Sequence, residues 1–120
     1  MAGPLRYVVL RHEGIPDPHF DIMLERQDGS ALETWRSKFW PITQPTSLSK
    51  LSDHRLEYLE YEGPLSGDRG FVKRIECGTY KARPQWDDPY VCDVWFNEPV
   101  THHLWLLSPP DHEWAFEPAG

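Results

Sequence analysis

Two neighbouring stretches decide the fold of this chain: YVVLRH at residues 7–12 and HFDIMLE at residues 19–25. The first is a β-branched, apolar run of the kind found in strands. The second alternates in polarity, so that its apolar side chains share one face while His19 and Asp21 share the other. The Asp-Gly pair at residues 28–29 is a strong signal for a tight hairpin turn. The N-terminal part of the chain is therefore predicted to form antiparallel strands.

The remaining sequence continues the pattern of short strands separated by turns. Proline occupies 12 of 120 positions, about twice its usual ~5%, and proline ends helices and marks turns. This pattern is typical of a β-sandwich or a closed barrel. We expect an all-β fold, a small antiparallel β-barrel of about eight strands with at most a short helix, in a single domain over residues 1–120. The expected later strands cover residues 31–35, 56–61, 71–76, 79–82, 90–96, 102–107 and 114–117, with a turn at residues 77–78 and a helical turn near residues 48–51.

The charge balance limits the nucleic-acid partners that the chain can have. It carries 12 Lys and Arg against 19 Asp and Glu, a net charge of −7. A protein that wraps duplex DNA shows a basic surface instead. A small contact with one strand end, assisted by a bound cation, remains compatible with this charge. The aromatic residues supply bulk for a core, and we expect Trp86, Trp95, Trp105 and Trp114 to lie in it.

The sequence also bears on location. Cys77 and Cys92 form no CxxC motif, and we interpret them as reduced thiols. Residues 1–6 lack an apolar signal-peptide core, and the longest apolar runs, at residues 7–10 and 104–107, are too short to span a membrane. We therefore expect a cytoplasmic protein with no membrane partner, and a monomer.

Three side chains near the N-terminus predict a metal site. His19 and Asp21 are two residues apart on a strand and so project from the same face. His12 ends the preceding strand, and pairing of the two strands would bring it beside His19. Two imidazoles and one carboxylate suit a divalent first-row metal, and three protein ligands leave positions open for water or substrate.

Several motifs then resemble one known family in their order along the chain. The chain resembles the 3′-phosphoesterase domain of bacterial DNA ligase D. The similar segments are residues 7–12 and 19–25, the Asp28-Gly29 turn, Trp35, DHRLEY at residues 53–58, YEG at residues 61–63 and CGTY at residues 77–80. The resemblance covers roughly residues 7–80 and fades after Tyr80.

The resemblance implies a β-barrel with a manganese-preferring activity in DNA repair. Members of the family remove 3′-terminal phosphates and trim terminal ribonucleotides. By this resemblance His12, His19 and Asp21 match the metal ligands, whereas His54 and Tyr58 match residues that contact the reacting phosphate. The implied partner is the 3′ end of a primer-template, with any polymerase or ligase supplied by separate proteins.

The chain departs from the family pattern at positions that concern phosphate binding. Met23 stands where the family has an arginine, Leu10 where it has a glutamine and Ser52 where it has an acidic residue. Methionine cannot replace the bidentate fork of a guanidinium. Arg36 or Lys38 can supply the missing cation; Arg11 and Arg55 are further candidates. If residues 54–58 form a strand, His54 and Tyr58 share one face.

Two other functions are compatible with these residues. The chain can be a catalytically degenerate member of the family that binds a protein or a DNA end, which Met23 and the acidic charge favour. It can also be a small iron(II) cupin-like oxygenase, using His19 and Asp21 with a distant histidine such as His102, since two histidines and one carboxylate also form the facial triad. His102, His103 and His112 show no carboxylate at a telling spacing, so we interpret them as structural or surface residues.

Overall fold

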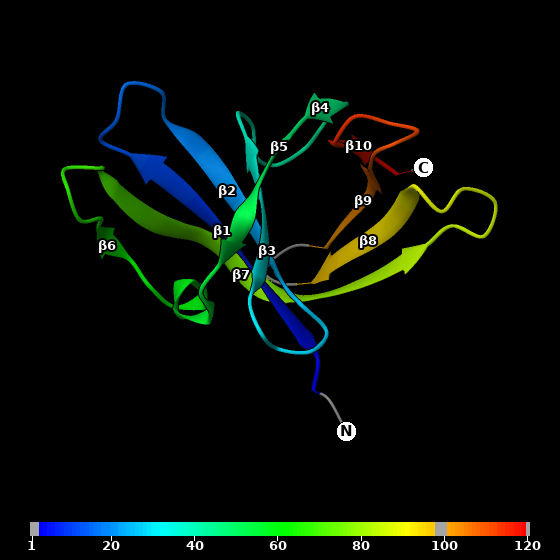
Figure 1. Ribbon diagram of the computed structural model, residues 1–120, viewed down its shortest axis with the longest axis horizontal. Helices are drawn as coiled ribbons and strands as arrows, with labels where there is room; N and C mark the ends of the chain where they lie inside the picture. Colours follow the sequence, from blue (N-terminus) through cyan, green and yellow to red (C-terminus); the bar gives the residue numbers. More distant parts are fainter. Residues whose placement is uncertain (1–2, 98–100, 120) are drawn as a thin grey trace.

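The computed structural model describes residues 3–97 and 101–119. Within these ranges the chain forms ten strands and one 3₁₀ helix, so the expected all-β class is confirmed (Figure 1). The elements are β1 (Leu5–Glu13), β2 (His19–Glu25), β3 (Leu32–Ser37), β4 (Thr46–Ser47), β5 (Ser49–His54), η1 (Leu56–Leu59), β6 (Gly63–Pro64), β7 (Phe71–Pro84), β8 (Val91–Asn97), β9 (His102–Leu107) and β10 (Ala115–Pro118). The described residues contain no helix that is long and apolar enough to cross a membrane.

The strands form one antiparallel sheet that curls into a nearly closed barrel. Its order is β4-β10-β9-β8-β7-β1-β2-β3-β5, with β6 paired to β7 beside this path. The first and last strands of the path, β4 and β5, are separated in sequence by Leu48 alone. The backbone N–H of Leu48 donates to the Trp114 carbonyl at 3.0 Å. The two edges of the sheet therefore meet where the chain passes from one to the other, and the predicted barrel is confirmed.

The N-terminal hairpins follow the sequence prediction. Strands β1 and β2 pair from Tyr7 opposite Leu24 to His12 opposite His19. The turn after β2 closes with the Arg26 N–H donating to the Ala31 carbonyl. Gly29 has φ of +72° there, a conformation that glycine adopts without a steric penalty. The Asp-Gly signal therefore located the turn correctly.

Three local predictions were wrong, two of them because pairing with a distant strand prevailed over a local signal. The expected helical turn at residues 48–51 is absent: Leu48 links β4 to β5, and residues 49–51 belong to β5, which pairs with β3. The expected strand at residues 56–61 begins as a 3₁₀ helix instead, whose period of three brings Leu56 and Leu59 onto one face. The expected turn at residues 77–78 lies inside the 14-residue strand β7, where it pairs with β1.

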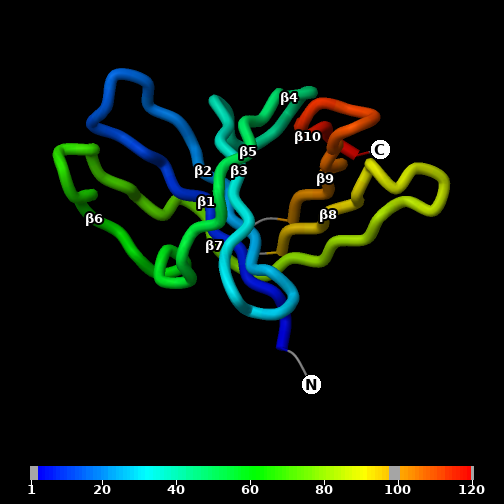
Figure 2. Tube along the Cα trace, in the orientation of Figure 1, coloured from blue at the N-terminus to red at the C-terminus, as the bar shows by residue number. Residues whose placement is uncertain are grey.

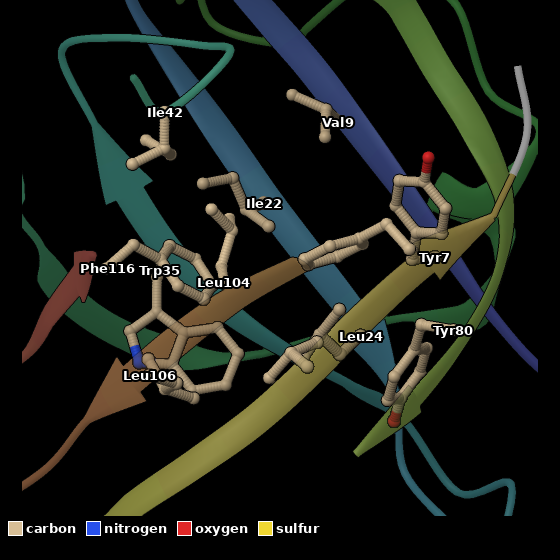
Figure 3. Packing of buried hydrophobic residues seen from close by; sticks show 12 residues of the cluster. Tyr7, Val9, Ile22, Leu24, Trp35, Ile42, Tyr80, Leu104, Leu106 and Phe116 are labelled. Atoms are coloured by element: carbon tan, nitrogen blue, oxygen red, sulfur yellow. The ribbon is translucent and has the colours of Figure 1, made fainter. Parts of the chain in front are cut away.

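The barrel interior holds the main hydrophobic core (Figure 3). Trp35 is 1% exposed and packs edge-on against Trp114, with ring centroids 5.6 Å apart. The prediction for Trp86 was wrong: it lies in the β7–β8 connection and is 95% exposed. Trp95 and Trp105 are half-buried, and only Trp114 of the four expected residues packs against the core cluster.

A second, smaller hydrophobic cluster lies on the other face of the sheet. Its buried members are Val8, Leu10, Met23, Leu32, Leu59 and Val72. These side chains alternate along β1 and β2 with those of the barrel interior, so they point outward. η1 contributes Leu59 and thereby covers this part of the outer face. The side chains of His12, His19 and Asp21 belong to the same outward-pointing set.

Candidate metal centre

The structure brings the three predicted ligands together. His12 near the end of β1 is the direct cross-strand partner of His19 at the start of β2, and Asp21 follows two residues later on the same face. One ligand atom from each residue lies within 4.8 Å of the others. His19 and Asp21 are each 5% exposed, and His12 is half-buried. His12 is therefore the most exposed of the three.

Backbone carbonyls fix which imidazole nitrogens face the cluster. Nδ1 of His19 lies 2.9 Å from the carbonyl oxygen of Asp17, and Nε2 of His12 lies 2.6 Å from that of Arg69. A carbonyl only accepts, so each of these nitrogens carries the proton and donates it. The opposite nitrogens, Nε2 of His19 and Nδ1 of His12, lie 3.3 Å apart, and in the neutral forms of both rings they carry lone pairs that face each other. This is the outer hydrogen bonding that orients histidine ligands in metal sites.

The carboxylate of Asp21 supplies a second sign of an ion site. Its Oδ1 atom is buried and has no hydrogen-bond partner among the described residues. It lies 3.5 Å from Nε2 of His19 and 3.5 Å from Nε of Arg36. A buried carboxylate oxygen without a partner is costly and calls for an explanation. A cation between the two lone pairs and this oxygen would compensate it, and the donor set fits a divalent first-row metal.

Two connections support the cluster from outside: residues 14–18 between β1 and β2, and residues 65–70 between β6 and β7. They lie side by side at the left of Figure 2. The turn at residues 66–70 carries the Arg69 carbonyl that accepts from His12. Leu65 N–H donates to the Gly70 carbonyl at 2.8 Å, which closes this turn. Gly70 has φ of +78°, and a Cβ there would overlap the carbonyl oxygen of Glu13. Only glycine fits at this contact, because any side chain would push the turn away from β1.

The two candidate cations have different positions. Arg36 on β3 is the cross-strand partner of Asp21, and its guanidinium is the cation nearest to the cluster among the described residues. Lys38 follows the end of β3, is exposed, and lines a depression of about 180 Å³ with Phe39 and Trp40. It forms no ion pair with a described carboxylate. The structure therefore brings Arg36, but not Lys38, to the cluster.

His54 and Tyr58 do not join the three ligands. The prediction that they share a strand was wrong, because His54 ends β5 while Tyr58 lies in η1; their rings nevertheless meet at 5.6 Å. His54 pairs with Leu32, a residue that itself pairs with Glu25. His54 is thus two strands across and four residues along from Asp21, a separation of roughly 15 Å between Cα atoms.

The positions that depart from the resembled family are packed with apolar side chains. Leu10 is 0% exposed and Met23 is 1% exposed, and both belong to the outer hydrophobic cluster. Leu10 is the cross-strand partner of Asp21, and Met23 comes two residues after it on the same face. The side of the metal cluster that faces Leu10 and Met23 is therefore lined by buried apolar side chains.

The other histidines find partners that sequence spacing could not reveal. His102 on β9 lies 3.0 Å from Glu76 on β7, inside the barrel. The indole N–H of Trp40 also donates to Glu76, at 3.3 Å, and the Tyr7 hydroxyl donates to it at 2.6 Å. Burial, and then this carboxylate, raise the pKa of Tyr7. His102 does not reach His19 and Asp21, so the ligand set considered for an oxygenase does not assemble around it.

Two surface histidines form comparable pairs. His103 lies 2.8 Å from Asp93, and His112 lies 3.1 Å from Asp88. Both carboxylates come from other strands or connections. These contacts agree with a structural or surface role for the histidines.

Neither a scan against protein-family models nor a search of the curated proteins finds a match to this chain.

Proposed function

We propose that this protein is a metal-dependent phosphoesterase that processes the 3′ end of a nucleic-acid strand. One observation carries the metal site: two imidazole lone pairs and an unpartnered carboxylate oxygen converge from His12, His19 and Asp21. The resemblance to the ligase D phosphoesterase domain supplies the reaction, and manganese is the ion that it implies. A divalent ion held here would neutralise phosphate oxygens and lower the pKa of a bound water.

The protein's own groups have defined tasks in this proposal. The Asp17 carbonyl keeps the proton of His19 on Nδ1 and so keeps Nε2 free to bind. Arg36 lies beside Asp21 and remains partly exposed, so its guanidinium can turn to a phosphate and bind two of its oxygens. Arg36 thereby takes the part of the arginine that Met23 replaces.

His54 and Tyr58 take a different part from the one that the resemblance implies. His54, at the end of β5, lies roughly 15 Å from Asp21 between Cα atoms. At that separation His54 does not reach a phosphate held by the three ligands. Tyr58 packs edge-to-face against His54 and against the outer hydrophobic cluster. We therefore assign them to binding of the strand, not to the reacting atoms.

The experiment is release of phosphate from a primer-template that ends in a 3′-phosphate, with manganese and with EDTA. The wild-type protein is expected to release phosphate only with the metal. His19→Ala is expected to lower this rate at least about 100-fold, the upper end of the loss seen when even an outer-shell partner is removed. His103→Ala is the matched control, because His103 pairs with Asp93 away from the cluster. Equal rates in the His19→Ala and wild-type proteins would refute the proposal.

A second candidate is a binding module of the same fold without catalysis. Burial of Leu10 and Met23 beside the metal cluster favours it, because these positions leave no polar group to bind phosphate there. This candidate predicts manganese binding with no phosphate or ribonucleotide release from any 3′ end. The same assay, combined with a direct measurement of manganese binding, separates the two functions.

A further inference from the structure

A polar pocket of about 320 Å³ adjoins the metal cluster on the outer face of the sheet. It is lined by residues of the segment 55–61, which contains η1, and of the β6–β7 segment, which is at the left of Figure 1. Among the residues that line it are Arg55, Tyr58, Tyr61, Ser66 and Arg69. Two arginines, Arg55 and Arg69, therefore line one pocket of a chain whose net charge is −7, and Glu57 lines it as well.

Both arginines retain capacity to bind an anion. Arg69 donates from Nε and one terminal nitrogen to Ser66, and it pairs with no carboxylate in the described part of the chain. A guanidinium has five N–H donors, so most of those of Arg69 stay free. Arg55 pairs with Glu57 at 2.7 Å, but the two side chains are 79% and 58% exposed. Such surface pairs contribute little, so a phosphate can displace the carboxylate.

The aromatic residues of the pocket add a surface for a nucleobase. Tyr58 and Tyr61 pack edge-to-face with centroids 5.9 Å apart. The Tyr58 hydroxyl has no hydrogen-bond partner within residues 3–97 and 101–119. Aromatic faces next to cations are the usual means of holding single-stranded nucleic acid without sequence preference.

One residue connects this pocket to the metal cluster. The side chain of Arg69 lines the pocket, while its carbonyl oxygen accepts from Nε2 of His12 at 2.6 Å. We propose that the pocket binds a backbone phosphate of the strand whose 3′-terminal phosphate lies at His12, His19 and Asp21. This inference rests on the proposed function, since it names how the same substrate continues beyond its reacting end.

The test measures binding of a short fluorescein-labelled single-stranded DNA with a 3′-hydroxyl end, in EDTA and at increasing salt. Neither the metal nor a terminal phosphate takes part, so the result is independent of catalysis. Arg55→Gln and Arg69→Gln are each expected to weaken binding and to reduce the slope of log affinity against log salt by about 0.7. Lys81→Gln is the control, because Lys81 is an exposed cation of β7 outside both sites, and its slope should match the wild type.

Each outcome bears on the inference. An unchanged slope in both arginine variants, or no binding of this DNA by the wild type, would overturn it even if the protein releases 3′-phosphate. Reduced slopes in a protein that releases no 3′-phosphate would support the pocket and refute the proposed catalysis. Arg55 makes no contact with the cluster, so Arg55→Gln decides the matter if Arg69→Gln disturbs the turn.

Discussion

Asp21 and Glu76 are two nearly buried carboxylates that project from opposite faces of the same sheet. Glu76 points into the barrel and accepts hydrogen bonds from Tyr7 and Trp40, with His102 at 3.0 Å. Asp21 points outward and leaves Oδ1 without a hydrogen-bond partner among the described residues. Both have histidine beside them, yet only one has its lone pairs satisfied by the protein itself.

The difference teaches that burial and histidine contact do not mark a functional carboxylate by themselves. Glu76 is held by three side chains that can all donate, so it needs no further partner. Around Asp21 both histidines donate an N–H group to a backbone carbonyl, and their other ring nitrogens face each other within the cluster. A cation placed between these nitrogens and Oδ1 would find three ligand atoms. The hydrogen-bond donors, not the residue types, distinguish a structural cluster from a candidate metal centre.

The largest expected effect is on stability and concerns Glu76. Glu76→Ala leaves three nearly buried donors without an acceptor and should lower the free energy of unfolding by about 3–5 kcal/mol. Asp21→Asn, measured without metal, should change it by less than about 1 kcal/mol, because Oδ1 is buried without a hydrogen bond and its contacts with Arg36 and His19 are long, at 3.5 Å. Urea unfolding in EDTA measures both. Equal losses in the two variants would contradict the comparison.

Stabilisation by manganese should depend on Asp21 and not on Glu76, the opposite of the order expected without metal. At a manganese concentration about 100 times its dissociation constant, the wild type should gain about 2.7 kcal/mol of stability. Asp21→Asn should lose most of this gain, while Glu76→Gln, which keeps an acceptor oxygen, should retain it. Thermal unfolding with and without manganese checks the prediction. If Glu76→Gln lost the stabilisation by manganese and Asp21→Asn retained it, the ion would bind inside the barrel instead.

The turn that carries the Arg69 carbonyl allows a subtler test. Gly70→Ala should displace this turn from Glu13 and weaken manganese binding about 10- to 100-fold, as removal of an outer hydrogen bond to a ligand does. Gly67→Ala is the matched control, since Gly67 also has positive φ but open space around its Cβ position. It should cost about 1 kcal/mol of stability and leave metal affinity unchanged. Similar affinities in the two variants would argue against a role for the carbonyl.

A third carboxylate, that of Glu25, forms an ordinary ion pair with Arg6 and provides the smallest expected effect. Hydrogen bonds from the Arg6 side chain hold the pKa of Glu25 below its usual value. A lowered folded-state pKa adds stability above the unfolded pKa, which disappears as the pH falls through the folded value. Glu25→Gln should therefore cost about 1 kcal/mol near neutral pH and progressively less below pH ~4.5. Unfolding measured across this range checks the sign; a constant difference would refute it.

The sequence predicted the elements whose signals were local. The alternation at residues 19–25 and the turn at residues 28–29 predicted the hairpin of β2 and β3, and the two adjacent strand patterns at residues 7–12 and 19–25 predicted the pairing in which His12 meets His19. Strand periodicity also placed Asp21 on the face of His19. These relations need only the geometry of adjacent strands, which a sequence specifies.

What the sequence could not predict depends on contacts between distant segments. The carbonyl of Arg69 is 57 residues from His12, and no residue type marks a backbone acceptor. The Gly at position 78 signals a turn locally, but pairing with Tyr7 extends it into β7. Arg36 could be proposed only as one cation among several until its pairing with Asp21 was known.

The central pairing of the sheet has a consequence for how the chain acquires its shape. Strands β1 and β7 pair from Leu5 opposite Tyr80 to Glu13 opposite Phe71, so the middle of the barrel joins residues far apart in sequence. Folds dominated by such contacts form slowly, because the conformational entropy lost in closing the long loop comes before the contacts contribute any stabilisation. During synthesis the hairpins of residues 5–37 can assemble first, with one side of β1 unsatisfied until β7 emerges. Arg6 and Arg11 are exposed charges on opposite faces of β1, and such charges discourage the pairing of an unpaired strand with other chains.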